Sequence, residues 1–190
     1  MGNADNNRMS ALGRYYVKGH YGNKESNNII FEEIESLVLF QVAFWPDTVS
    51  KVEKILNSEL GIKKIPKPGS SIINSSASVI RVEPLKIWVT AKLEEDTSKA
   101  DTPILDLSHS RTNLIIHGND ATKLLNRFLP IDLRENSFGI GAVASTIFHH
   151  VGITLWRTER GYHLFLPRGF SLSLFELLKK GAKQFGLQIK

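Results

Sequence analysis

The sequence predicts an α+β fold: two ferredoxin-like β-α-β-β units from a divergent duplication, with helices packed on mainly antiparallel sheets. Three observations support this prediction. The stretch from Thr112 to Leu129 changes from a strand period to a helix period. The order strand, capped helix, Pro-containing connector and strands occurs at 37–91 and again from Thr112. Further strand patterns then follow one another directly, which is typical of antiparallel pairing.

Composition predicts one compact domain made of two halves. The 190 residues are 42% hydrophobic and 23% charged, which is ordinary for a globular protein. Residues 1–30 hold six Asn and four Gly with little apolar periodicity, so we expect a flexible N-terminal arm. The first α+β half is predicted at 31–105 and the second at 106–190. No apolar run approaches a membrane span and no secretory signal is visible, so a cytoplasmic location is expected.

Cysteine content and charge narrow the possible chemistry. The absence of Cys excludes disulfides, thiolate nucleophiles and thiolate metal sites. The formal charge of +5 is matched by residues 157–190 alone, which carry seven Lys or Arg and two acids. An acidic partner, a polyanion or nucleic acid could use this charge. A solvated helix face is the favoured interpretation, because Lys179, Lys180 and Lys183 lie opposite an apolar stripe.

In the first half, the apolar run 37–44 predicts a buried strand. Asp47 or Thr48 can cap a following helix, and Gly61 sits where a left-handed C-terminal cap is expected. The basic stretch 63–71 lacks the P-loop pattern and is interpreted as a linker. Strands are expected at 79–82 and 85–91, followed by a polar loop at 94–102.

In the second half, a strand from Thr112 is broken at Gly118, and the following helix should run to Leu129, where Pro130 stops it. Strands are expected at 141–148, 151–157 and 161–166. A further amphipathic helix should follow Pro167, and 187–189 should return as an edge strand.

Motifs for catalysis or metal binding are weak. Asp106, Ser108 and His109 have the residue types of a hydrolase triad, but Ser108 and His109 would point to opposite faces of a strand. The alternative is that Asp106 and Ser108 bind backbone amides at a strand entrance. His149 and His150 fit a hairpin tip and lack metal-ligand spacing.

Two longer patterns also have structural interpretations. The Gly-x-Gly-x-x-Ala match at 139–144 leads into a strand instead of a helix, so its glycines should serve a turn. Cations and aromatics interleave at 156–168, as on a platform for single-stranded nucleic acid, but alternation separates Trp156 from Arg157 and favours an ordinary core with a charged rim. The residues alone therefore predict no active site.

Two stretches of the second half carry a family resemblance. One begins at Asp106 to Thr112 and continues at 118–121, 124–125 and 130–133. The other comprises 144–146, 155–157 and 166–170. Together they resemble the gamma subunit of heterotetrameric sarcosine oxidase. The first half is compatible but less similar, and residues 1–30 are not covered.

The resemblance implies a non-catalytic subunit with the fold of the folate-binding region of glycine-cleavage aminomethyltransferases. It implies a complex that oxidatively demethylates sarcosine to glycine, forming hydrogen peroxide and 5,10-methylenetetrahydrofolate. FAD, FMN, NAD, zinc and tetrahydrofolate are implied for the partner alpha, beta and delta subunits, with no cofactor in this chain. A folate-transferring homologue needs a buried carboxylate in a pterin pocket and a further barrel domain, whereas this chain ends at Lys190.

The predicted role is thus assembly of the complex, with no catalytic, cofactor-binding or metal-binding residue and with neither nucleic acid nor membrane as a partner. We expect the subunit interface at the strand entrance and on the side of the second-half hairpin, at Asp106, Ser108, His109, Arg111, Arg157 and Arg168. Two alternatives remain: a free-standing folate-binding or one-carbon-transfer protein, and a basic nucleic-acid-binding adaptor.

Overall fold

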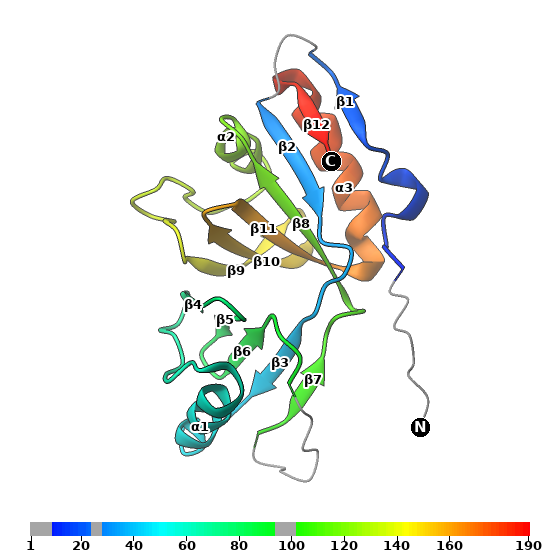
Figure 1. Cartoon of the computed structure of the whole chain (residues 1–190). Coiled ribbons are helices and arrows are strands. Elements are labelled where there is room, and N and C mark those ends of the chain that lie inside the picture. The colour runs from blue at the N-terminus through cyan, green and yellow to red at the C-terminus, as the bar shows by residue number, and fades with distance from the viewer. Residues whose placement is uncertain (1–8, 24–27, 94–101) are drawn as a thin grey trace.

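The computed structural model describes residues 9–23, 28–93 and 102–190, which form two β-sheets and three α-helices (Figure 1). The first sheet contains β3 (Phe40–Ala43), β4 (Ser71–Ile73), β5 (Ser78–Glu83), β6 (Lys86–Val89) and β7 (Ile104–Asp106). The second contains β1 (Gly19–Tyr21), β2 (Ile29–Glu33), β8 (Arg111–His117), β9 (Val143–Phe148), β10 (Val151–Thr158), β11 (Gly161–Pro167) and β12 (Leu187–Ile189). Only the β12–β2 pair is parallel among these strands, so the predicted mainly antiparallel α+β fold is confirmed.

The two halves repeat one topology. The first sheet has the order β4-β5-β6-β3-β7, and the second has the order β1-β12-β2-β8-β11-β10-β9. A helix joins β3 to β4 and another joins β8 to β9, so β4-β5-β6-β3 corresponds to β9-β10-β11-β8. This recurrence supports the proposal that the halves derive from a duplication.

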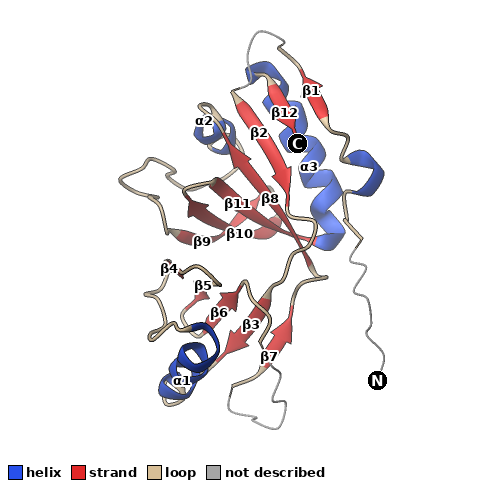
Figure 2. Cartoon of the chain, viewed as in Figure 1, coloured by secondary structure: helices blue, strands red, loops and turns tan. Residues whose placement is uncertain are grey.

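The halves also exchange strands. β2 precedes β3 along the chain but pairs with β8, while β7 precedes β8 but pairs with β3. Two crossover links, 34–39 and 107–110, therefore run side by side between the sheets, and Leu107 N donates to Leu39 O at 2.8 Å. Figure 2 shows both links between the upper and the lower sheet, 34–39 running down from β2 and 107–110 running up from β7.

Three apolar clusters hold the layers together. α1 (Val49–Leu60) covers one face of the first sheet, and α2 (Ala121–Leu125) and α3 (Ser171–Ala182) cover one face of the second. The third cluster lies between the sheets and includes Leu39, Trp88, Trp156 and Phe165. Gly61 ends α1 in the left-handed conformation with φ 69°, as predicted. No described helix is long and apolar enough to cross a membrane.

Two expectations differ from the structure, and a third falls mostly outside the described residues. The helix from Ala121 ends at Leu125 because the next amides, from Arg127 and Phe128, bond three residues back and tighten the chain into turns. Residues 187–189 are not an edge strand, since β12 lies between β1 and β2. Of the loop predicted at 94–102, residues 94–101 lie outside the described residues.

The predicted flexible arm is structured in the parts that the structure describes. Leu12 is fully buried in the core under α3, next to the short 3-10 helix η1 (Gly13–Tyr15), and β1 pairs with β12. The Tyr16 hydroxyl accepts the Glu33 amide at 2.8 Å and donates to Phe31 O at 3.2 Å. The arm has few apolar and aromatic residues, but these are enough to order it because they pack against a surface that the rest of the fold provides. Residues 1–8 and 24–27 lie outside the described residues.

Candidate functional site

The strand entrance at 106–111 is a turn whose polar groups bind the two crossover links. Asp106 Oδ1 accepts the Ser108 amide at 2.7 Å, and Ser108 Oγ accepts the Leu39 amide at 3.0 Å in a buried position. The structural interpretation of Asp106 and Ser108 is therefore confirmed. His109, between them and β8, is exposed.

Two arginines lie beside this turn. Arg111, the first residue of β8, is half-buried, with its guanidinium carbon 5.6 Å from the centre of the Trp88 ring. Burial lowers the pKa of Arg111 below its ordinary value. Arg168 opens the 3-10 helix η2 (Arg168–Phe170) after β11, and its amide donates to Ser110 O at 3.0 Å. Ser108, His109, Arg111 and Arg168 thus lie at one end of the second sheet, and Asp106 ends the adjoining strand β7 of the first sheet.

Arg157 is not part of this group. It is opposite Tyr162 at the other end of β10 and β11, with its guanidinium 4.1 Å from the centre of that ring. Arg168 follows the far end of β11, and six positions at about 3.3 Å each separate Arg168 from Tyr162 by roughly 20 Å. The strand register thus places Arg157 and Arg168 at opposite ends of the β10–β11 hairpin, and their expected role in a subunit interface stays a prediction.

A cleft of about 310 Å³ lies between the two sheets. Trp88 Nε1 donates to Gln41 Oε1 at 3.2 Å on one wall, and the Lys86–Glu83 ion pair at 2.8 Å closes its rim. Arg111 reaches the same cleft. Sequence reasoning missed Gln41 and Trp88, because they belong to apolar strands and gain a role only when the sheets meet. The cleft combines a half-buried cation with neutral hydrogen-bonding groups.

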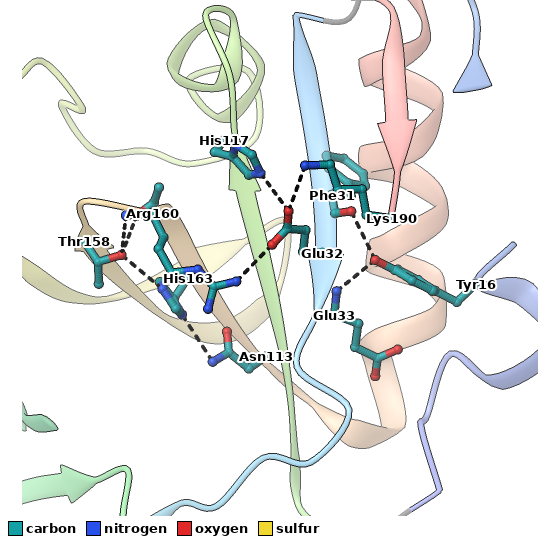
Figure 3. Close-up of polar contacts among 11 residues, drawn as sticks. Tyr16, Phe31, Glu32, Glu33, Asn113, His117, Thr158, Arg160, His163 and Lys190 are labelled. Atoms are coloured by element: carbon teal, nitrogen blue, oxygen red, sulfur yellow. Dashed lines mark hydrogen bonds and ion pairs between the residues drawn. The ribbon is translucent and has the colours of Figure 1, made fainter. Parts of the chain in front are cut away.

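A carboxylate-centred cluster lies on the face of the second sheet opposite α3 (Figure 3). Glu32 in β2 binds His117 at 3.2 Å, Arg160 at 2.9 Å and Lys190 at 3.4 Å. Burial raises the pKa of Glu32, but hydrogen bonds from His117, Arg160 and Lys190 outweigh it and lower that pKa below its ordinary value. The cluster ties β2, β8, the β10–β11 turn and the end of β12 together.

His163 forms a buried polar group on the same face. Its Nε2 lies 3.1 Å from Thr158 Oγ1, and its Nδ1 lies 3.3 Å from Asn113 Nδ2 (Figure 3). Burial, with a smaller effect of Arg160, lowers the pKa of His163 to about 4, so the ring is neutral near pH 7. Trp156, 4.7 Å from the His163 ring, is also buried. Buried rings cannot stack on nucleobases, so the nucleic-acid platform is not formed.

The remaining motifs take the predicted structural roles. His149, at φ 52°, and His150 form the β9–β10 turn. Gly141 adopts φ 88° in the turn before β9 and bonds to Arg157 O. Within 9–23, 28–93 and 102–190, no group of three His, Asp or Glu residues could hold a metal ion.

The cleft does not offer the buried carboxylate expected of a pterin pocket. Among the described residues, the one buried carboxylate is Asp120, at the start of α2. Asn28 Nδ2 donates to it at 2.8 Å and Lys123 pairs with it at 2.6 Å. Hydrogen bonding to Lys123 and Asn28 keeps its pKa low, so this carboxylate is ionised and already satisfied. These residues do not fit a folate site.

The two-sheet architecture defines an α+β class of protein seen in solved structures of the folate-binding aminomethyltransferase fold. The chain is similar to the glycine cleavage system aminomethyltransferase T from Bartonella henselae, with TM-score 0.62 and 16% identity over 86% of this chain and 48% of that one. It is also similar to a chain of the heterotetrameric sarcosine oxidase from Corynebacterium sp. U-96 in complex with pyrrole 2-carboxylate. That match has TM-score 0.75 and 18% identity over 94% of this chain and 96% of that one.

Sequence comparison identifies more particular relatives. Sarcosine oxidase gamma subunits from Corynebacterium sp. (strain P-1) and Arthrobacter sp. are 34% and 33% identical over 65 and 67 residues. These matches cover 34% and 35% of this chain and span about a third of the relatives' length, 32% and 33%. No protein-family profile matches the chain. The predicted resemblance to this gamma subunit and the predicted fold are both confirmed.

Proposed function

We propose that the chain is the gamma subunit of a heterotetrameric sarcosine oxidase. The observation that carries the proposal is the agreement of two independent likenesses. The sequence is similar to gamma subunits, and the fold matches a chain of that heterotetramer over 94% of this chain. Within the proposed complex, sarcosine is oxidatively demethylated to glycine, with formation of hydrogen peroxide and 5,10-methylenetetrahydrofolate.

The proposed role of this chain is to support assembly. FAD, FMN, NAD, zinc and tetrahydrofolate would be held by the alpha, beta and delta subunits, in the cytoplasm. The described polar groups support this division of labour, since Ser108 and Asp106 bind backbone amides and His163 is buried and neutral. Their hydrogen-bonding capacity serves the fold instead of a substrate.

The strand entrance is the proposed interface. Subunit interfaces have an apolar centre and a polar rim. Here Leu105 in β7 and Val38 in the neighbouring crossover link are 54% and 41% exposed. His109 and Arg111 follow Leu105 along the chain, and the Arg168 amide donates to Ser110 O of the same turn. Arg157 would belong to a separate contact at the other end of the sheet.

Co-expression with the genes encoded beside it tests the proposal. A yellow, flavin-bearing assembly of several different chains that contains this chain is the expected result. A colourless monomer or homodimer would overturn the proposal. In the assembly, the double variant Arg157→Glu/Arg168→Glu should reduce co-purification of partners without unfolding the chain. The single variants tell the two separate contacts apart, and retention of all partners by the double variant would mean that neither arginine contributes to an interface.

A further inference from the structure

The outer side of α3 carries a groove whose lining includes no residue of the strand entrance at 106–111. The groove lies between α3 and β1, has a volume of about 760 Å³ and exceeds the 310 Å³ cleft between the sheets. Small-molecule pockets typically have about 300–1,000 Å³, but this one is an open surface groove. Its lining residues are Tyr21, Ser173, Glu176, Leu177, Lys179, Lys180 and Lys183.

The floor of the groove is apolar. Leu177 is 38% exposed, although its neighbours Leu174 and Leu178 are buried in the core on the inner side of α3. The Tyr21 ring forms the opposite wall, and its hydroxyl donates to Val17 O at 2.7 Å, which fixes the ring. A lone exposed leucine is common on a protein surface. Here it lies in a concave site beside an aromatic ring that the folded N-terminal segment holds in place.

The rim of the groove is cationic. Lys179, Lys180 and Lys183 outnumber the single acid Glu176, which leaves two positive charges. Lys179 Nζ lies 4.1 Å from the centre of the Tyr21 ring. Lys180 and Lys183 are exposed and form no ion pair with a described residue. Lysines at the end of a helix also complement its dipole, but that effect needs no groove.

We propose that this groove binds an acidic segment of a partner chain, which places an apolar side chain on Leu177 and Tyr21 and its carboxylates against Lys180 and Lys183. The inference rests on the proposed function, because the partner is another subunit of the same assembly. A nucleic acid fits less well: Lys179 covers the face of Tyr21 on which a base would stack, and Glu176 would repel phosphate.

The test is partner retention by the double variant Lys180→Glu/Lys183→Glu in the co-expressed assembly. Lys63→Glu/Lys64→Glu is the matched control, since these two lysines are exposed in the first half, outside the groove. Both variants should have the melting temperature of the wild type. We expect the groove variant to weaken partner binding about tenfold, with a reduced dependence on salt, and the control to bind normally. Leu177→Ser should weaken binding without changing its salt dependence.

Each outcome separates the two proposals. If the wild type assembles and the groove variant retains its partners, the groove proposal is overturned and the proposed function stands. If the wild type joins no assembly, the proposed function fails and the groove proposal fails with it. Retention on single-stranded oligo(dT) that disappears in the groove variant, while assembly is unchanged, would assign the groove to a polyanion and overturn the proposal of an acidic protein segment.

Discussion

Removal of the Tyr16 hydroxyl tests how firmly the N-terminal segment belongs to the fold. This hydroxyl accepts the Glu33 amide and donates to Phe31 O, so it bonds twice to the backbone of β2. The ring packs against Phe175 of α3 with centroids 5.6 Å apart. Burial raises the pKa of Tyr16 well above its usual range, so the hydroxyl stays protonated and can donate at all physiological pH values.

The expected cost follows from the two hydrogen bonds. Each contributes about 0.5–1.5 kcal/mol, so Tyr16→Phe should reduce the free energy of unfolding by about 1–3 kcal/mol. For a domain of this size, each kcal/mol lowers the melting temperature by roughly 2–4 °C. Tyr16→Ala should cost more, because it also removes the ring from the core under α3.

Urea denaturation of the purified chain measures this cost, and Tyr15→Phe is the matched control. Tyr15 is 44% exposed, and the exposed Arg14 guanidinium donates to its hydroxyl at 3.1 Å. The control should therefore stay within about 0.5 kcal/mol of the wild type. If Tyr16→Phe is no less stable than Tyr15→Phe, the segment contributes nothing through this hydroxyl and the reasoning is refuted.

Three further predictions concern stability. The pKa of His163 is near 6.5 in the unfolded chain and about 4 in the fold, so the free energy of unfolding should fall as pH drops through that window, by up to roughly 1.4 kcal/mol per pH unit. The variant His163→Gln should flatten this pH profile, and an unchanged slope would contradict the assignment. Ser108→Ala leaves a buried crossover amide unpaired and should cost about 1–3 kcal/mol by urea denaturation, whereas a cost near zero would contradict this role. Gly118→Ala should lower the melting temperature, because a φ of 108° disfavours a side chain and the new Cβ would clash with Asn28 O. Gly169→Ala is the control, since open space surrounds Gly169. Equal melting temperatures of the two variants would refute the steric argument.

Local patterns predicted most of the elements that carry their own signal. The helix ending before Gly61 and the hairpin of β10 and β11 have clear periodicity and turn residues. β1 was missed because Gly19–Tyr21 has almost no strand signal and forms only beside β12. Tertiary pairing, which no local pattern records, supplies the stability of such a short strand.

The candidate site divides in the same way. The roles of Asp106 and Ser108 followed from the ordinary chemistry of turns and needed no tertiary information. The separation of Arg157 from Arg168 required the strand register, and the cleft beside Trp88 required knowledge of how two sheets meet. Long-range geometry therefore limited the prediction of the site more than residue chemistry did.

The exchanged strands affect how the chain can fold during synthesis. β2 leaves the ribosome early, yet Ile29 pairs with Leu187, 158 positions later, and β7 completes the first sheet only after β3 to β6 exist. Contacts between such distant positions raise the contact order and slow folding. The apolar residues Ile29 and Phe31 of β2 therefore stay unpaired with the parallel strand β12 until translation is nearly complete. A proteolytic cut between residues 93 and 102 would leave two fragments, each still carrying a strand that the other needs, so the fragments should complement each other in trans and fold poorly apart.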